Sequence, residues 1–226
     1  MAYKQNLGDM MVKPDGYYAN IRNEMLSYIP KKPKRVLEIG CGEGLFGKKL
    51  KELYGCEVWG IELFPESAAV AKKNLDKVLV GDVAVAIDKL PNNYFDCVVC
   101  NDVLEHLEDP YSVIERLRAK LVKNGIIVSS IPNVRYFHNL YSLIMAKEWE
   151  YQDAGILDKT HLRFFTINSI RNMFTRHGYE IVKLEGINPM TQFPWEYRAA
   201  NILFRGKLTD TKFMQFACVA QKSDAS

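Results

Sequence analysis

Three glycines spaced two residues apart follow a short apolar stretch early in the chain, with an acidic residue just before them. They are Gly40, Gly42 and Gly44, preceded by Glu38. Glycine has no Cβ, so the backbone can turn sharply here and a ligand can lie against the main chain. Apolar residues then return at helical spacing, and the free N–H groups at a helix start favour polar or anionic ligand atoms. The stretch therefore predicts a site for an adenosine-containing cofactor.

The spacing of these glycines distinguishes two kinds of cofactor. The dinucleotide fingerprint Gly-x-Gly-x-x-Gly, started at Gly40, would need a third glycine where the chain has Leu45. It does match two residues later, at Gly42, Gly44 and Gly47. Gly40 would then have to belong to the strand, whereas an acidic residue followed by Gly-x-Gly-x-Gly fits without a shift. We favour the second pattern, with a tight turn that binds nothing as the alternative.

Apolar runs of strand length alternate with helical periodicity along most of the chain. Strands are expected at 36–39, 57–61, 77–80, 95–100, 125–131, 179–186 and 213–221, and helices at 17–28, 65–75 and 167–177. Such an alternation predicts a parallel sheet covered by helices on both faces, with ligands at the carboxyl ends of its strands. The glycine turn follows the first of these strand ends.

Two further acidic residues follow the second and third predicted strands. Glu62 lies twenty residues beyond Gly42, and a carboxylate there can accept hydrogen bonds from both hydroxyls of a ribose. A plain surface glutamate is the alternative. Asp82 could accept from an adenine amino group or cap the next helix, because aspartate is a good N-cap. Both roles of Asp82 stay open.

Four histidines are candidates for proton transfer. Histidine titrates near neutral pH, so it suits a general base that takes the proton of a hydroxyl. His106 and His161 fall where the alternation places the mouth of the site, and they are the predicted catalytic residues. His161 also lies near Asp158 in the chain. His138 belongs to a long insertion, and His177 closes a helix, where a cation is favourable. Purely structural roles remain the alternative for His106 and His161.

No metal site is predicted. His106 could be imagined as a ligand together with Glu105 and Asp109, but helical spacing does not bring all three onto one face.

Two stretches rich in aromatic residues interrupt the alternation, at 133–166 and 187–211. A connection as long as the first is usually functional or disordered, and its aromatic content argues against disorder. We therefore expect both stretches to be cap insertions over the active site. The 226 residues are expected to form a single domain, 1–226, with an irregular N-terminal segment at 1–16.

Composition gives no case for a nucleic acid or a membrane as partner. The formal net charge is only +3, with 48% hydrophobic and 25% charged residues. Five cysteines lie mostly in apolar runs, which suits reduced thiols, and Cys97 and Cys100 should point to opposite faces of one strand. No signal peptide and no membrane-spanning run is recognisable, so the expected location is cytoplasmic.

The stretch around Glu38 and Gly40 resembles motif I of the class I S-adenosylmethionine-dependent methyltransferases. Two further runs narrow the likeness: Leu-Glu-His-Leu-Glu-Asp-Pro at 104–110 and Thr-His-Leu-Arg-Phe-Phe-Thr at 160–166. They resemble the ubiquinone-pathway O-methyltransferases and the methyltransferases encoded beside glycosyltransferases in surface-polysaccharide gene clusters. The resemblance implies an α/β fold, Rossmann-like and doubly wound, whose seven-stranded sheet is mostly parallel with an antiparallel C-terminal strand.

The resemblance also implies a set of residues that bind S-adenosyl-L-methionine. Gly40 would contact it through the backbone, and Asn101 would lie beside its sulfur-bearing arm. Arg22 would pair with the carboxylate of the methionyl part. Leu63 would lie against the adenine. The complete implied set is Arg22, Glu38, Gly40, Cys41, Gly42, Gly44, Glu62, Leu63, Asp82, Val83 and Asn101.

Methyl transfer to a small-molecule acceptor, at a hydroxyl oxygen, is the function that we expect. No Asn-Pro-Pro-Tyr or Asp-Pro-Pro-Tyr follows the fourth strand, which argues against methylation of DNA bases. A quinone precursor, a sugar and a lipid-linked saccharide stay open as acceptors, as does the oligomeric state. Two other classes stay open: a scaffold that binds the cofactor without turnover, and an NAD-dependent dehydrogenase that uses the shifted glycine match.

Overall fold

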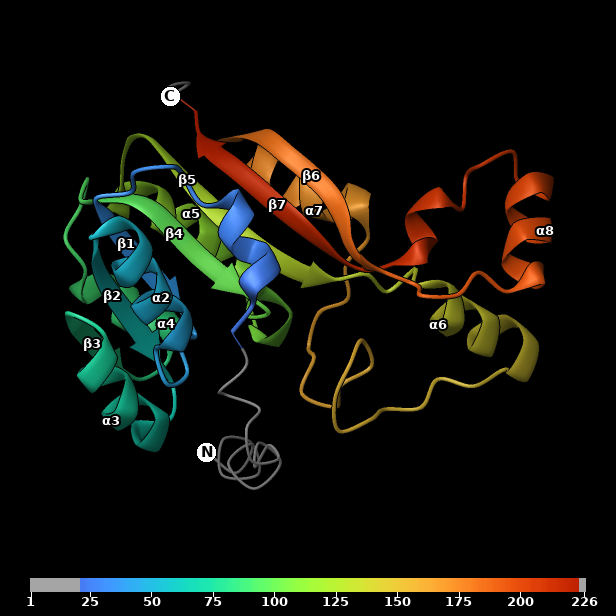
Figure 1. Ribbon diagram of the computed structural model, residues 1–226, viewed down its shortest axis with the longest axis horizontal. Coiled ribbons are helices and arrows are strands. Elements are labelled where there is room, and N and C mark those ends of the chain that lie inside the picture. The colour runs from blue at the N-terminus through green and yellow to red at the C-terminus, as the bar shows by residue number, and fades with distance from the viewer. Residues whose placement is uncertain (1–20, 224–226) are drawn as a thin grey trace.

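Residues 21–223 are described by the computed structural model, and their strands form one sheet (Figure 1). The strands are β1 (Arg35–Ile39), β2 (Glu57–Glu62), β3 (Lys77–Val80), β4 (Phe95–Asn101), β5 (Leu121–Pro132), β6 (Tyr179–Pro189) and β7 (Phe213–Lys222). Their order is β3-β2-β1-β4-β5-β7-β6. The first five are parallel, and β7 runs antiparallel to both β5 and β6. The predicted Rossmann-like sheet is confirmed.

Most strands match the apolar pattern to within one residue, but β5 and β6 are longer by three residues or more. β5 begins at Leu121, because this residue pairs with Phe95 beside a register shift in β4. β6 continues to Pro189, which pairs with Phe213. Backbone pairing, which the apolar pattern does not report, sets these ends.

Helices connect the parallel strands. They are α2 (Leu45–Tyr54), α3 (Pro65–Asn74), α4 (Val83–Ala86) with η3 (Ile87–Lys89), and α5 (Pro110–Lys120), while α7 (Ile167–Arg176) precedes β6. Local signals start them: the Asp109 carboxylate caps α5, which has Pro110 in its first turn, and Thr166 and Ser169 form a capping box at α7. Residues 17–20 of the predicted helix at 17–28 lie outside the described residues, and within 21–28 the helical part is the 3-10 helix η2 (Asn23–Tyr28). The predicted irregular segment 1–16 lies outside the described residues.

The two faces of the sheet carry separate apolar cores. Leu37 belongs to one core and Val36 to the other, as strand alternation requires. Cys100 and Cys97 are divided in the same way, so the prediction that they point to opposite faces is confirmed. All five cysteines are buried free thiols.

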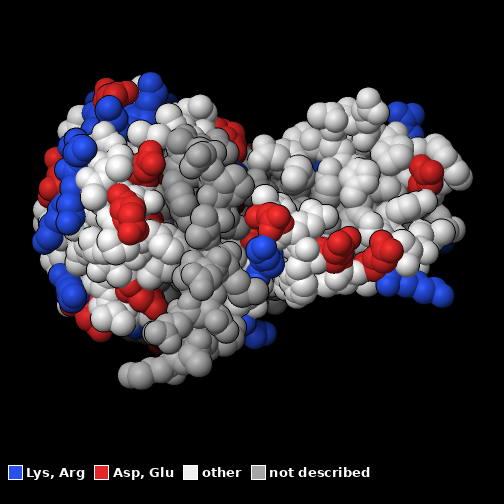
Figure 2. Space-filling model, turned by 90° about the horizontal axis from the view of Figure 1, so that it is seen from below, with Lys and Arg blue, Asp and Glu red and all other residues white. Residues whose placement is uncertain are grey.

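The two aromatic insertions build a lobe that projects from the sheet. It contains α6 (Phe137–Tyr141), the π-helical turn η5 (Ser142–Ala146), α8 (Trp195–Leu203) and η6 (Thr209–Lys212), and it lies to the right in Figure 1. Phe137, Met190 and Tyr197 form a small core of their own. The lobe is mostly uncharged on the face seen in Figure 2, and Trp195 and Ile202 are 73% and 80% exposed.

Candidate active site

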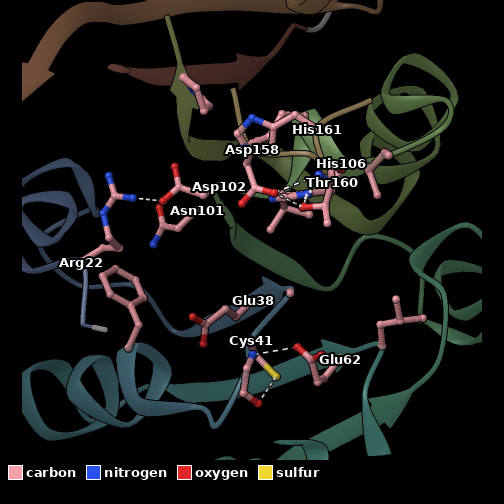
Figure 3. Close-up of a pocket in the computed structure, with 18 of the residues that line it drawn as sticks. Arg22, Glu38, Cys41, Glu62, Asn101, Asp102, His106, Asp158, Thr160 and His161 are labelled. Atoms are coloured by element: carbon pink, nitrogen blue, oxygen red, sulfur yellow. Dashed lines mark hydrogen bonds and ion pairs between the residues drawn. The ribbon is translucent and has the colours of Figure 1, made fainter. Parts of the chain in front are cut away.

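The carboxyl ends of β1, β2 and β4 open into a cavity of about 780 Å³ (Figure 3). Most of the predicted site residues line it: Arg22, Glu38, Gly40, Cys41, Gly42, Glu62, Leu63, Asn101, His106 and His161. Only the first insertion reaches the cavity, through residues between 155 and 161. No residue of 187–211 lines this cavity: Ile187 packs in a core of the sheet, and Met190 and Tyr197 belong to the small core of the lobe. The cap role expected of that stretch stays a prediction.

The glycine turn after β1 has a left-handed backbone. The φ angles of Gly40, Gly42 and Gly44 are +64°, +53° and +75°. The Gly40 N–H donates to the Ile61 carbonyl oxygen over 2.8 Å, which ties the turn to β2. A Cβ on Gly40 would lie 2.7 Å from Cγ2 of Val103. Glycine is therefore required at this position by both the backbone angle and the close approach.

Two buried carboxylates accept hydrogen bonds from the backbone of this turn and of the helix that follows it. The Gly47 N–H donates to Oε2 of Glu38 over 3.1 Å, and the Gly42 N–H donates to Oε2 of Glu62 over 2.8 Å. Glu62 Oε1 accepts a further hydrogen bond of 3.0 Å from the Phe64 N–H. Burial raises the pKa of Glu38 to about 8, against the effect of the Gly47 hydrogen bond. Both residues thus hold the turn, and the expected contact of Glu62 with a ribose stays a prediction.

The glycine turn and the residues beside it line one side of the cavity, which we call the cofactor wall. An ion pair between Arg22 and Asp102 lies at the other end of this wall (Figure 3). Both residues line the cavity. The sequence drew attention to Arg22 but not to Asp102, whose only local signal is its place directly after a strand. Asn101 directly precedes Asp102, and its two side-chain amide atoms are buried and have no hydrogen-bond partner within 21–223. A buried amide that lines a cavity in this way is available to a ligand.

His106 and His161 lie together on the side of the cavity opposite the cofactor wall, which we call the facing wall. Their rings are 4.6 Å apart in an edge-to-face arrangement. Nδ1 of His161 is 2.9 Å from the Ile156 carbonyl oxygen, and Nδ1 of His106 is 3.1 Å from that of Thr160. Because a carbonyl oxygen can only accept, each Nδ1 carries a hydrogen in these contacts. In the neutral rings, Nε2 is then the basic nitrogen, and the predicted pair is brought to one place.

Asp158 holds the loop that supplies His161. Its Oδ1 accepts hydrogen bonds from the Thr160 N–H over 2.8 Å and from the Thr160 hydroxyl over 2.7 Å. The same threonine offers its carbonyl to His106. The loop is joined to η4 (Leu104–His106) because the Leu162 and Arg163 N–H groups donate to the Glu105 carbonyl oxygen over 2.8 and 3.0 Å. The sequence identified the loop but not these contacts.

Glu105 adds a buried carboxyl group that the sequence analysis did not assign to the site. Its side chain is 1% exposed, and neither carboxylate oxygen has a hydrogen bond from residues 21–223. Oε1 lies 4.0 Å from Nε2 of His161. Burial raises the pKa of Glu105 to about 8, and the charge of Arg22 opposes this shift. The site therefore contains a carboxyl group that favours its protonated form beside two imidazoles.

A divalent metal ion could be held by this cluster. Donor atoms of Glu105, His106 and His161 lie within 4.8 Å of one another, and carboxylate with imidazole is a common ligand set. The trio considered from the sequence is not the one that assembles, since Asp109 instead caps α5 through the Tyr111 and Ser112 N–H groups. The absence of a metal stays a prediction.

The remaining predicted residues do not line the cavity. Asp82 is exposed and accepts a hydrogen bond of 2.8 Å from the Ala84 N–H, so its capping role is found. Val83 is buried, and neither it nor Asp82 nor Gly44 lines the cavity. His177 contacts the Met173 carbonyl oxygen at the end of α7, over 2.7 Å. The adenine contacts expected of Asp82 and Val83 stay predictions.

Comparison with known proteins gives the class. The sequence profile of a family described as a methyltransferase domain matches residues 13–184. The chain therefore belongs to this family, as the glycine turn and the fold had indicated, and the predicted class of enzyme is confirmed.

Individual relatives share the same domain. The mitochondrial ubiquinone biosynthesis O-methyltransferase of Schizosaccharomyces pombe is 30% identical over 168 residues, which are 70% of this chain and 60% of that protein. The ubiquinone biosynthesis O-methyltransferase of Paraburkholderia phymatum is also 30% identical over 168 residues, which cover 71% of its length.

A solved structure supports the fold. It belongs to a SAM-dependent methyltransferase from Archaeoglobus fulgidus and has a TM-score of 0.67 at 23% identity, covering 92% of this chain and 97% of that one. Within residues 21–223 no helix has both the length and the apolar character needed to cross a bilayer.

Proposed function

We propose that this protein transfers a methyl group from S-adenosyl-L-methionine to a hydroxyl oxygen of a small molecule. The observation that carries the proposal is that one cavity joins the glycine turn at Gly40 to the histidine pair His106 and His161. The cofactor wall and the facing wall thus lie on either side of the space where a reaction would occur. The names of the relatives, which are O-methyltransferases, support the choice of oxygen.

The residues of the cofactor wall fit the proposed methyl donor. Gly40 lines the cavity with its backbone, the Asn101 amide that has no partner within 21–223 also lines it, and Arg22 offers a cation to a carboxylate. Glu62 and Leu63 would hold the ribose and the adenine. When bound, the cofactor supplies an activated methyl group, and the protein contributes mainly by positioning the acceptor.

The histidines of the facing wall would accept the proton of the acceptor hydroxyl. A neutral imidazole with its hydrogen on Nδ1 can take that proton on Nε2, and both histidines have this arrangement. The Ile156 and Thr160 carbonyls hold the two rings in place. An ionised Glu105 carboxylate, 4.0 Å from Nε2 of His161, would stabilise the imidazolium that forms, whereas its protonated form would not. His161 and His106 remain the proposed catalytic residues.

The acceptor is proposed as a class. A hydroxylated aromatic quinone precursor is favoured by the names of the relatives, and a sugar or a lipid-linked saccharide remains the alternative. No nucleic acid is proposed as partner. We place the activity in the cytoplasm, because five buried free thiols suit a reducing compartment.

Calorimetric titration tests the proposal first. The purified protein is titrated with S-adenosylmethionine, S-adenosylhomocysteine and NAD, and the two sulfur compounds are expected to bind in about the micromolar range. Glu62→Ala should weaken both, since the Gly42 N–H loses its acceptor. Binding of NAD alone would support a dehydrogenase instead.

Turnover is then measured with a catechol and with sugar hydroxyls as acceptors. Methylation of either supports the enzyme, and the preferred compound assigns the acceptor class. Tight binding of S-adenosylmethionine without turnover on any hydroxyl acceptor would favour the scaffold.

A further inference from the structure

Asp102 has an uncommon backbone conformation at the edge of the cavity. It directly follows β4, and its φ angle is +52°, in the left-handed region that residues with a side chain seldom adopt. Its backbone N–H donates to the carbonyl oxygen and to Oγ of Ser130, over 3.2 and 3.1 Å. These contacts with β5 hold the residue so that its carboxylate lines the cavity. Backbone strain of this kind occurs often at functional sites.

One oxygen of the Asp102 carboxylate accepts two hydrogen bonds, and the other has one partner. Oδ1 accepts hydrogen bonds from the Ser130 hydroxyl over 3.0 Å and from Nε2 of Gln215 over 2.7 Å. Oδ2 pairs with Nη1 of Arg22. A carboxylate oxygen has two acceptor positions, so Oδ2 retains one within the part of the chain that is described. A second cation could therefore bind beside Arg22.

Arg22 is held in a similar way. Its Nε donates to Glu24 over 2.7 Å and its Nη2 donates to Oε1 of Gln215 over 2.7 Å. With Nη1 on Asp102, three of the five N–H groups of the guanidinium are used by these contacts. One N–H is left on each terminal nitrogen, and such a pair is the fork that a carboxylate takes. Gln215 contacts both members of the ion pair and sets their relative position.

The pair thus presents a cation and an anion side by side to the cavity. Their side chains are 15% and 25% exposed, so the charges are reachable but only partly hydrated. The amino-acid end of S-adenosylmethionine carries one carboxylate and one ammonium group. Placed against the pair, each of its charges would meet an opposite charge, and the net charge of this corner would stay unchanged. A site with Arg22 alone would leave the ammonium group unmatched.

We propose that Asp102 binds the ammonium group of the methionyl part of the cofactor, while Arg22 binds its carboxylate. This inference rests on the proposed function, since it concerns the same site. Asp102 is a cofactor-binding residue, and Gln215 positions the pair. The proposed contact requires both the negative charge of the Asp102 carboxylate and the ammonium group at the amino-acid end of the ligand.

Two ligands separate this role from a merely structural one. S-adenosylhomocysteine carries the amino-acid end, whereas 5′-methylthioadenosine has the same adenosine and sulfur without it. Asp102→Asn keeps the shape of the side chain and removes its charge. We expect the variant to bind S-adenosylhomocysteine about 10-fold or more weakly, because a charge-assisted hydrogen bond is lost, with 5′-methylthioadenosine affinity within about 2-fold of the original. Arg22→Lys should show the same pattern.

Glu24→Gln is the matched control. Glu24 also forms an ion pair with Arg22, over 2.7 Å, but it does not line the cavity. Its substitution should leave both affinities within about 2-fold. A loss of S-adenosylhomocysteine affinity as large as that of Asp102→Asn would overturn the proposal, because any partner of Arg22 would then have the same effect.

The wild-type protein provides an independent test that does not depend on the folding of a variant. An analogue of S-adenosylhomocysteine that lacks only the amino group should bind the wild-type protein about 10-fold more weakly than S-adenosylhomocysteine itself. Equal affinity for the two would overturn the proposal. So would an Asp102→Asn variant that weakens 5′-methylthioadenosine as strongly as S-adenosylhomocysteine.

The failure of the proposed function has a different signature. A wild-type protein that binds neither S-adenosylhomocysteine nor 5′-methylthioadenosine would overturn the cofactor assignment itself, and the role of Asp102 with it. Binding of both ligands with no preference for the amino-acid end would overturn only the role of Asp102.

Discussion

The two walls of the cavity are built differently. The cofactor wall is a backbone turn whose shape is set by left-handed glycines and by the buried carboxylates of Glu38 and Glu62, all at the ends of adjacent parallel strands. The facing wall consists of side chains from η4 and from the loop at 155–161, which are far apart in the chain. Its geometry depends on backbone carbonyls of Ile156 and Thr160.

This difference separates what is common to a fold from what a single chain can vary. The cofactor wall is an extension of the sheet and carries little that could be changed without loss of the turn. The facing wall takes part of its residues from an insertion that also contributes to the lobe. The lobe has a core of three buried residues. Substitutions in the two walls should therefore change different quantities, and each can be measured separately.

The largest effect is expected from Gly40→Val. The new side chain would clash with Val103 and force an unfavourable φ of +64°, so S-adenosylhomocysteine binding should fall by about 1000-fold or more. Calorimetry measures this loss. Gly55→Val is the control, because Gly55 has the same φ of +64° with nothing within 4 Å of an added Cβ. If both variants lost binding equally, the close approach at Gly40 would have no special role.

His161→Gln and His106→Gln address the facing wall. Loss of a general base should lower kcat by about 100-fold, while S-adenosylhomocysteine affinity stays within about 2-fold. Steady-state kinetics and calorimetry measure the two quantities. His138→Gln, at an exposed position of the lobe, should change neither. A variant of either histidine that lost cofactor affinity and kept kcat would show that the walls are not separate.

Phe137→Ala tests whether the lobe is independent of the sheet. Phe137 is buried in the small lobe core and packs on Tyr197 with ring centroids 5.4 Å apart. The substitution should destabilise the lobe by about 3 kcal/mol. Limited proteolysis should then cut the lobe faster, with S-adenosylhomocysteine affinity unchanged. Weaker cofactor binding would mean that the lobe supports the cofactor wall after all.

Glu105→Gln should change the pH dependence of stability. The pKa of Glu105 is raised to about 8 in the folded protein, so folding favours its protonated form. Its contribution to stability is complete below the ordinary glutamate pKa and is lost as the pH rises toward 8. Glutamine cannot ionise, so between pH 5 and pH 8 the variant should lose less stability than the wild-type protein.

Thermal unfolding at pH 5 and pH 8 measures this difference between the two proteins. Glu66→Gln, at an exposed position of α3, is the control and should leave the pH dependence as it is. An unchanged pH dependence in Glu105→Gln would show that the buried carboxyl group is not the source of it.

Much of the cofactor wall could be predicted from the sequence, and less of the facing wall. The glycine turn, Glu38 and Glu62 follow strands that the apolar pattern predicted, so their common position was implied by the fold. His106 and His161 were identified, but the contact of Glu105 with His161 joins residues 56 positions apart and has no local signal. The lobe was recognised as two insertions, yet its projection from the sheet was not.

The sequence by itself determined the order of strands and helices along the chain, the sharp glycine turn at Gly40 and the opposite faces of Cys97 and Cys100, because these depend on short-range periodicity and on residue type. Tertiary structure alone decided that Asp102 meets Arg22, that Glu105 joins the histidines and that no residue of 187–211 lines the cavity. Such pairings depend on how segments far apart in the chain fold back on the sheet, and no local pattern of residues carries that information.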